Sequence, residues 1–212
     1  MKSSRTILSC LISITLVLIL FAQNASATLV DFEDLSLGAT YHVGDSFTTA
    51  GVVITGEEFL LLTSGSAKVE NGGLAGGTGK ELHVNNINLG FNFGTALNAL
   101  TLQYGEYGGN INLEINGVLA NVDNFFDLPA SLGGTSVFTF DIGPHGNSKG
   151  AMFIIGTINT FKIGGEKLYL DNIVASPVPN VPEPATIVLL GTAGLCIFTR
   201  KKQKSLGVYK SK

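Results

Sequence analysis

Residues 111–122 read I-N-L-E-I-N-G-V-L-A-N-V, and this stretch decides the fold class. Apolar residues at every second position from Ile111 alternate with Asn112 and Glu114, which is the pattern of a strand with one buried face. Asn116-Gly117 then supplies the two residues with positive φ that a type I′ turn requires. The stretch therefore predicts an antiparallel hairpin with a two-residue turn.

The same pattern of short apolar runs between glycine and asparagine turns continues through residues 28–176. No window has a convincing helical period, so these residues predict one all-β domain. We expect an antiparallel β-sandwich that is jelly-roll-like, although an immunoglobulin-like strand order stays open. The expected strands are Leu29–Glu33, Gly51–Thr55, Glu58–Leu62, Ile87–Phe93, Ala99–Tyr104, Asn110–Ile115, Val118–Val122, Ser136–Asp141, Ala151–Ile155, Thr160–Ile163 and Lys167–Ala175.

Two glycine-rich sites interrupt this pattern. Gly164-Gly165 predicts a second tight turn, and Ser64–Lys80, with six glycines in 17 residues, predicts a long mobile loop. The loop ends in G-G-T-G-K, but Glu81 stands where a phosphate-binding loop needs Ser or Thr, and no helix follows. We therefore interpret it as a surface loop.

The first 27 residues have the three parts of a secretory signal peptide. Lys2 and Arg5 form a positive start, Ile7–Phe21 is apolar, and Ala25-Ser26-Ala27 is a small-residue cleavage site. We expect a signal peptide helix over residues 1–27 and a mature chain that begins near Thr28.

The other end has a matching three-part order. Residues 177–186 form a proline-rich linker, residues 187–199 an apolar helix, and residues 200–212 a basic cytoplasmic tail. The apolar run is shorter than the roughly 17–25 residues of a free membrane span, but a mismatch of a few Å costs little. The basic residues at both ends place both ends in the cytoplasm before processing. An ordinary C-terminal anchor is the alternative.

This tail resembles the PEP-CTERM sorting signal of Gram-negative bacteria. The residues that carry the motif are Val181, Pro182, Glu183, Pro184, Ala185 and Thr186, followed by the apolar run and the basic cluster. The resemblance implies transit through the inner membrane and recognition by an exosortase, a membrane-embedded cysteine transpeptidase-like enzyme. It also implies that the processed protein reaches the cell surface or the extracellular matrix.

Charge and cysteine content narrow the function classes of the mature domain. Residues 28–180 hold five lysines and 15 Asp and Glu, a net charge of about −10, which argues against nucleic-acid binding. Cys10 and Cys196 are the only cysteines and lie in the two apolar segments. The mature domain therefore has no disulfide, thiolate metal site or cysteine nucleophile.

The first and last strands carry acidic residues, Asp31 and Glu33 in one and Asp171 in the other. This arrangement resembles that of exported carbohydrate-binding-type jelly rolls. In those proteins, such carboxylates share a structural calcium ion with backbone carbonyls of the next loop. The resemblance implies a Ca²⁺ site at Glu33, Asp171 and Asp31, with Asp34 and Asp45 in reserve. The alternative is that these carboxylates are solvated strand ends.

We expect no enzyme activity. The three histidines lack metal-ligand spacing, no G-x-S-x-G motif occurs, and the adjacent Glu57 and Glu58 face opposite sides of a strand. Two carboxylates that are distant in sequence could still meet, so a polysaccharide-degrading enzyme stays the least favoured alternative.

Residues 103–110 read Q-Y-G-E-Y-G-G-N and predict a glycan-binding face. Aromatic rings stack on sugars and polar side chains bond their hydroxyls. The candidate ligand-binding residues are Gln103, Tyr104, Glu106, Tyr107 and Asn110, with Phe125-Phe126-Asp127 as an apolar rim. The expected ligand is an exopolysaccharide or surface glycan. The alternatives are that the rings belong to the core and that the protein is a structural or adhesive matrix component.

Overall fold

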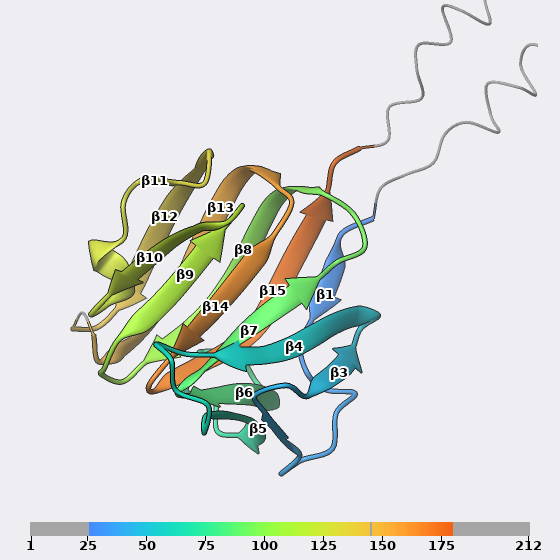
Figure 1. Cartoon of the computed structure of the whole chain (residues 1–212), viewed down its shortest axis with the longest axis vertical. Coiled ribbons are helices and arrows are strands. Elements are labelled where there is room, and N and C mark those ends of the chain that lie inside the picture. Colours follow the sequence, from blue (N-terminus) through green and yellow to red (C-terminus); the bar gives the residue numbers. More distant parts are fainter. Residues whose placement is uncertain (1–25, 145, 180–212) are drawn as a thin grey trace, which may run out of the picture. The chain divides into compact units, whose positions relative to one another are not determined.

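The computed structural model describes residues 26–144 and 146–179, which form an all-β fold with two antiparallel sheets (Figure 1). Sheet A has the order β11 (Ser131–Leu132), β12 (Thr135–Ile142), β13 (Ser148–Ile158), β8 (Leu97–Glu106), β15 (Leu168–Pro177), β6 (Lys80–Asn85), β5 (Ser66–Asn71) and β2 (Thr40–His42), and β1 (Thr28–Val30) pairs with β15. Sheet B has the order β10 (Val118–Val122), β9 (Ile111–Ile115), β14 (Phe161–Gly165), β7 (Ile87–Asn92), β4 (Val52–Glu58) and β3 (Ser46–Thr49). The predicted fold class is confirmed.

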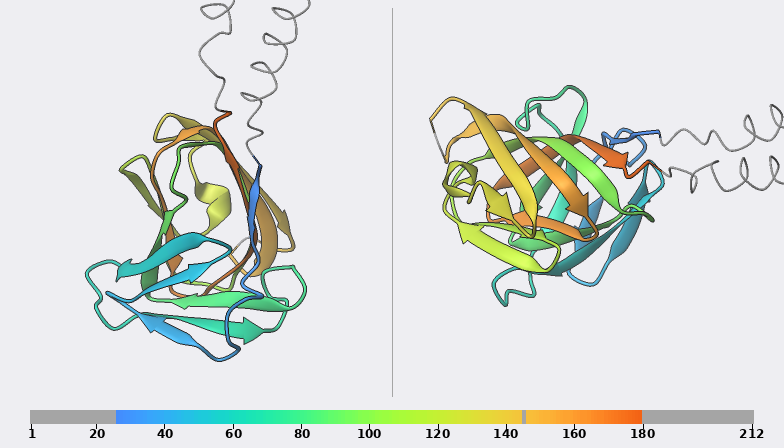
Figure 2. Two further views of the ribbon diagram at one scale, coloured as in Figure 1. Left: turned by 90° about the vertical axis from the view of Figure 1, so that its right-hand side faces the viewer. Right: turned by 90° about the horizontal axis from the view of Figure 1, so that it is seen from above.

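The two sheets face one another and bury one core between them (Figure 2). Inward positions alternate along the strands, so β7 buries Ile87, Leu89 and Phe91 and turns the residues between them outward. A short 3-10 helix, Phe125–Asp127, adds the fully buried ring of Phe125. The compact unit Ala25–Val178 contains every residue of this core, so we expect it to fold by itself.

The hairpin that decides the fold class is present as predicted. β9 and β10 pair from Ile115 opposite Val118, and Asn116 and Gly117 have φ values of 51° and 77°. Asn116 also ties the turn to the rest of the domain, because its side-chain Nδ2 donates to Gly133 O at 2.8 Å.

The first and last strands of the domain lie side by side, with Val30 opposite Ile173. β15 changes partners along its length: residues 168–170 pair with β6, whereas residues 173–175 pair with β1. Asp171 and Asn172 lie at this change, where the ladder with β8 is also irregular and Asn172 has a φ of 47°. The bulge therefore marks the point at which β6 and β1 separate along β15.

Three local predictions are wrong. Glu58–Leu62 is not one strand, because β4 ends at Glu58 and a tight turn with positive φ at Leu60 and Leu61 follows. The expected loop Ser64–Lys80 contains β5, since its polar residues alternate with the buried Ala67 and Val69. Gly164-Gly165 belongs to β14 rather than to a turn.

The remaining architectural predictions stay open. The chain alternates between the sheets from β6 to β9 and again from β13 to β15, which is compatible with a jelly roll, and that connectivity stays a prediction. The expected signal-peptide helix and apolar C-terminal helix lie outside the described residues. Within residues 26–144 and 146–179, no helix is long and apolar enough to span a membrane.

Candidate functional site

Residues 72–79, here called the glycine flap, connect β5 to β6 and fold back over the outer face of sheet A. The carbonyl of Leu74 accepts a hydrogen bond from the Tyr107 hydroxyl at 3.0 Å. The carbonyl of Gly73 accepts one from Lys149 Nζ at 3.1 Å, and Ala75 is fully buried. The flap is therefore anchored to β13 and to the residue that follows β8.

Two carboxylates are buried beneath the flap. Leu82 and Leu170 pair across β6 and β15 and point into the core, so Glu81 and Asp171 point to the outer face. Both would be exposed there, but their exposed fractions are only 1% and 2%. Glu81 Oε2 accepts the N–H of Ala75 at 2.7 Å, whereas Glu81 Oε1 is buried and has no hydrogen-bond partner among the described residues.

The flap backbone also contacts the acidic residues near the first strand. A Cβ added to Gly77 would overlap Asp171 Oδ2, and one added to Gly79 would overlap Glu33 Oε1. Glu33 is held by Lys80, whose backbone N–H donates to Oε1 at 2.6 Å. Asp31 lies beside it, since its Oδ1 accepts the N–H of Glu33 at 3.3 Å. Only glycine permits this close approach at positions 77 and 79.

This arrangement concentrates negative charge. Burial raises the pKa of Asp171 from 3.8 to about 6, and the charges of Glu81, Asp31 and Glu33 add to the increase. In residues 26–144 and 146–179, no three His, Cys, Asp or Glu side chains are grouped closely enough to hold a metal ion. The donors do suit a hard cation in type, but a complete set would need backbone carbonyls of the flap as well.

The structure thus brings Asp31, Glu33 and Asp171 near one another beside the glycine flap and adds Glu81, which the sequence reasoning missed. Alternation with Leu82 could have marked Glu81 as outward-facing, but only the folded flap buries it. The two reserve candidates serve turns instead. Asp34 Oδ2 accepts the N–H of Ala50 at 3.0 Å, and Asp45 Oδ2 accepts that of His42 at 2.8 Å.

The predicted glycan-binding face is not assembled, because β8 continues to Glu106 and alternates its side chains. Tyr104 is fully buried, packs edge-on against Phe125 with ring centroids 4.6 Å apart, and hydrogen-bonds Asp141. Glu106 is 1% exposed and accepts the backbone N–H groups of Phe125 at 2.8 Å and Gly146 at 2.6 Å. Tyr104 and Glu106 are therefore core residues that organise loops.

The other three members of the predicted face have partners within the domain. Gln103 Oε1 accepts a hydrogen bond from Asn172 Nδ2 at 2.8 Å, and Asn110 Nδ2 donates to Glu166 at 3.3 Å. Tyr107 supports the glycine flap and contacts the ring of Tyr169 edge-on. Of the expected rim, Phe125 is buried and Phe126 is exposed.

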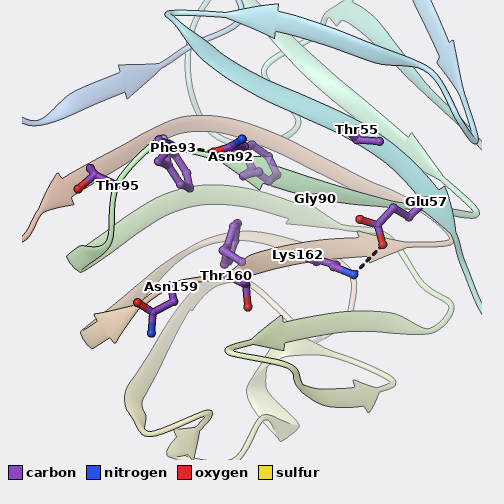
Figure 3. Close-up of a pocket in the computed structure, with 12 residues that line it drawn as sticks. Thr55, Glu57, Gly90, Asn92, Phe93, Thr95, Asn159, Thr160 and Lys162 are labelled. Atoms are coloured by element: carbon purple, nitrogen blue, oxygen red, sulfur yellow. Dashed lines mark hydrogen bonds and ion pairs between the residues drawn. The ribbon is translucent and has the colours of Figure 1, made fainter.

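A hollow of about 710 Å³ lies on the outer face of sheet B, which the sequence reasoning did not identify (Figure 3). Gly90 of β7 is an outward position between Thr55 of β4 and Lys162 of β14. Because glycine has no side chain, the middle of the face is depressed. The hollow is lined by Thr55, Glu57, Gly90, Phe91, Asn92, Phe93, Gly94, Thr95, Asn159, Thr160, Phe161 and Lys162.

An ion pair lies at one end of the hollow and an aromatic ring at the other (Figure 3). Lys162 Nζ is 2.7 Å from Glu57 and 3.7 Å from Glu114. The hydrogen bond to Glu57 and the charges of both acids raise the pKa of Lys162. A Cβ on Gly90 would lie 2.7 Å from Glu57 Oε1, so this glycine makes room for the carboxylate. Phe93 is half-buried and supplies the aromatic surface.

Comparison with known proteins concerns only the C-terminal tail. Residues 180–202 match the family model of the PEP-CTERM protein-sorting motif, and this confirms the resemblance of the tail. The predicted sorting residues, 181–186, fall within the match and outside the described residues. No curated protein and no solved structure matches the chain.

Proposed function

We propose that this exosortase-sorted, exported protein, anchored by its C-terminal segment before processing, uses its β-sandwich to bind a polysaccharide chain without cleaving it. The hollow of sheet B is the observation that carries this proposal. It is open to solvent, its volume is in the range of small-ligand sites, and it combines an aromatic ring with hydroxyl and amide groups.

The ligand in this proposal lies along the face between Phe93 and Lys162. Phe93 offers a ring for the apolar face of a sugar, while Asn92, Thr160 and the Lys162–Glu57 pair offer hydrogen bonds to hydroxyls. The hollow spans three strands and is open to solvent, which suits an extended ligand. In this proposal, the polar side chains that line the hollow on sheet B determine specificity, rather than the loop at residues 107–110.

Charge favours a neutral polysaccharide over an acidic one. The mature domain has a net charge of about −10, and the single lysine of the hollow is shared by two glutamates. A uronate polymer would meet repulsion at low ionic strength, and salt would weaken that repulsion. We expect neutral glucans or galactans to bind more tightly than uronate polymers.

The test is a calorimetric titration of residues 26–178 with neutral and acidic soluble polysaccharides. Phe93→Ala and Lys162→Ala should each weaken binding by about tenfold or more, equivalent to at least 1.4 kcal/mol. Lys68→Ala is the matched control, because Lys68 also pairs with a glutamate at 2.9 Å on an outer face, that of sheet A. Loss of binding in the control, or unchanged binding in both hollow variants, would contradict the proposal.

We also propose a structural calcium ion beneath the glycine flap, with Glu33, Asp171 and Asp31 as predicted and with Glu81 added. Because no three of these side chains are grouped closely enough in the described residues, binding requires the carboxylates to move toward the ion. The buried, unpartnered Glu81 Oε1 and the raised pKa of Asp171 support the binding of a cation at this place. Flap carbonyls would complete the oxygen ligands that calcium needs. Such an ion would tie the flap to the first and last strands.

A structural role in matrix cohesion remains the second candidate function. It is favoured by exposed apolar side chains on sheet A, which lie on β12 and β13.

A further inference from the structure

Five large apolar side chains lie exposed on the outer face of sheet A, on strands β12 and β13. These two strands lie toward one end of the sheet (Figure 1). These residues, here called the apolar strip, are Phe138, Phe140, Ile142, Phe153 and Ile155, and their exposed fractions range from 43% to 71%. They differ from scattered surface residues because they adjoin one another across one ladder. Phe138 pairs directly with Phe153.

The strip results from regular alternation along both strands. On β12, Val137 is buried between Ser136 and Phe138, and on β13, Ile154 is buried between Phe153 and Ile155. The core therefore determines which residues face outward, but it does not require them to be apolar. A strand with one solvated face normally has polar residues there. An exposed group of this kind is typical of an interaction surface.

The surroundings of the strip contain little charge. Lys149, opposite Ile142, is the charged residue on the outer face of β13, and its Nζ is turned to the carbonyl of Gly73 in the glycine flap. Ala151, opposite Phe140, and Ser136, opposite Ile155, are small. The strip is thus a continuous apolar surface within a domain that has a net charge of about −10.

We infer that the apolar strip is a self-association surface and that its partner is the strip of a second copy of this chain. A membrane surface fits poorly, because membrane-binding faces have lysine and arginine around the apolar residues, whereas residues 28–180 have five lysines and no arginine. A polysaccharide needs hydrogen-bonding groups, and the five side chains have none. An identical apolar strip matches this surface in polarity.

The strip is large enough for a weak, symmetric dimer. Three phenylalanines and two isoleucines that are about half exposed offer on the order of 500 Å² per copy, or roughly 1,000 Å² when two copies pack together. This is the lower end of specific interfaces. In a twofold arrangement each strip packs on its equivalent, so one patch suffices and the assembly closes. The hollow of each copy would stay open in the dimer, because it lies on sheet B and the apolar strip lies on sheet A.

The experiment is sedimentation velocity of residues 26–178 between about 5 and 200 µM, at low and high salt. We expect a monomer–dimer equilibrium that salt strengthens, since screening reduces repulsion between two acidic copies while apolar burial remains. The double variant Phe140→Thr/Phe153→Thr should weaken dimerisation at least tenfold. Threonine keeps the preference for a strand, and both side chains are exposed, so the melting temperature should stay close to that of the wild type.

The matched control is Leu119→Thr, which changes a 52% exposed apolar residue on β10 of sheet B and should leave the dimer intact. A wild-type domain that stays monomeric at 200 µM in high salt would overturn the inference. A dimer that is unaffected by the double variant would do the same. If the domain is monomeric but sediments with phosphatidylcholine vesicles, and the double variant does not, the strip binds lipid and the inference is wrong.

Discussion

Asp171 Oδ2 lies against the backbone of Gly77 so closely that residue 77 has no room for a Cβ. Gly77→Ala should therefore displace the glycine flap and lower the free energy of unfolding by about 1–3 kcal/mol. Urea denaturation of residues 26–178 measures this change. Thr78→Ala is the control, because Thr78 is an exposed neighbour in the same segment. Equal stability of Gly77→Ala and the wild type would show that the flap is not held in this position.

Calcium should stabilise the chelator-treated domain. A ligand that binds only the folded state adds about 2.7 kcal/mol at a hundredfold excess over its Kd, which corresponds to a rise of roughly 5–10 °C in melting temperature for a domain of this size. Differential scanning calorimetry with millimolar calcium checks the rise, and Asp171→Ala and Glu81→Gln should abolish it. A melting temperature that responds to neither calcium nor chelator would leave these groups as ordinary buried and surface carboxylates.

In chelator, the domain should lose stability as the pH rises from 4 to 7. The pKa of Asp171 is raised to about 6 in the folded state from an ordinary value of 3.8, so its contribution is fully present below pH 4 and is lost as the pH passes 6. This difference of about two units between the pKa values of the folded and unfolded states corresponds to about 2–3 kcal/mol in the free energy of unfolding. Urea midpoints at several pH values should show this trend, and Asp171→Asn should reduce it. Parallel pH curves for variant and wild type would contradict the assignment.

Glu106→Ala should destabilise the domain without a direct effect on glycan binding. Its carboxylate holds two backbone N–H groups, those of Phe125 and Gly146, and their loss leaves buried donors unpaired at a cost of about 2–4 kcal/mol. Denaturation and calorimetric titration below the melting transition separate the two effects. Glu58→Ala, at an exposed strand end, is the control for stability. Loss of glycan affinity in a fully folded Glu106→Ala domain would restore the binding face expected at residues 103–110.

The C-terminal tail should be removed in a host that has an exosortase. Intact mass of the exported protein should be lower there than in an exosortase deletion strain, because the motif at residues 180–202 is the recognition segment. Replacing Pro182-Glu183-Pro184 with Ala-Ala-Ala should give the higher mass in both hosts. An unprocessed wild-type tail in the exosortase-bearing host would remove the sorting interpretation while leaving the glycan test of residues 26–178 unaffected.

Much of the fold could be predicted because local patterns determine it. The hairpin at 111–122 needed only two-residue alternation and an Asn-Gly pair, and both are visible in neighbouring residues. β5 was missed because glycines surround it and its apolar residues, Ala67 and Val69, are few. Tyr104 and Glu106 were misplaced because the length of β8, and hence the side to which each residue points, depends on pairing with β13 and β15.

The sequence by itself determined the all-β class, the acidic and cysteine-free nature of residues 28–180, and the sorting tail, because these depend on composition, alternation and contiguous motifs. Only the tertiary structure decided which carboxylates are buried and where a ligand could fit. Glu81 is covered by a flap that folds back over its own sheet, and the hollow at Lys162 needs three strands that are far apart in the chain. Burial and concavity are properties of packed strands, and no short stretch of sequence contains them.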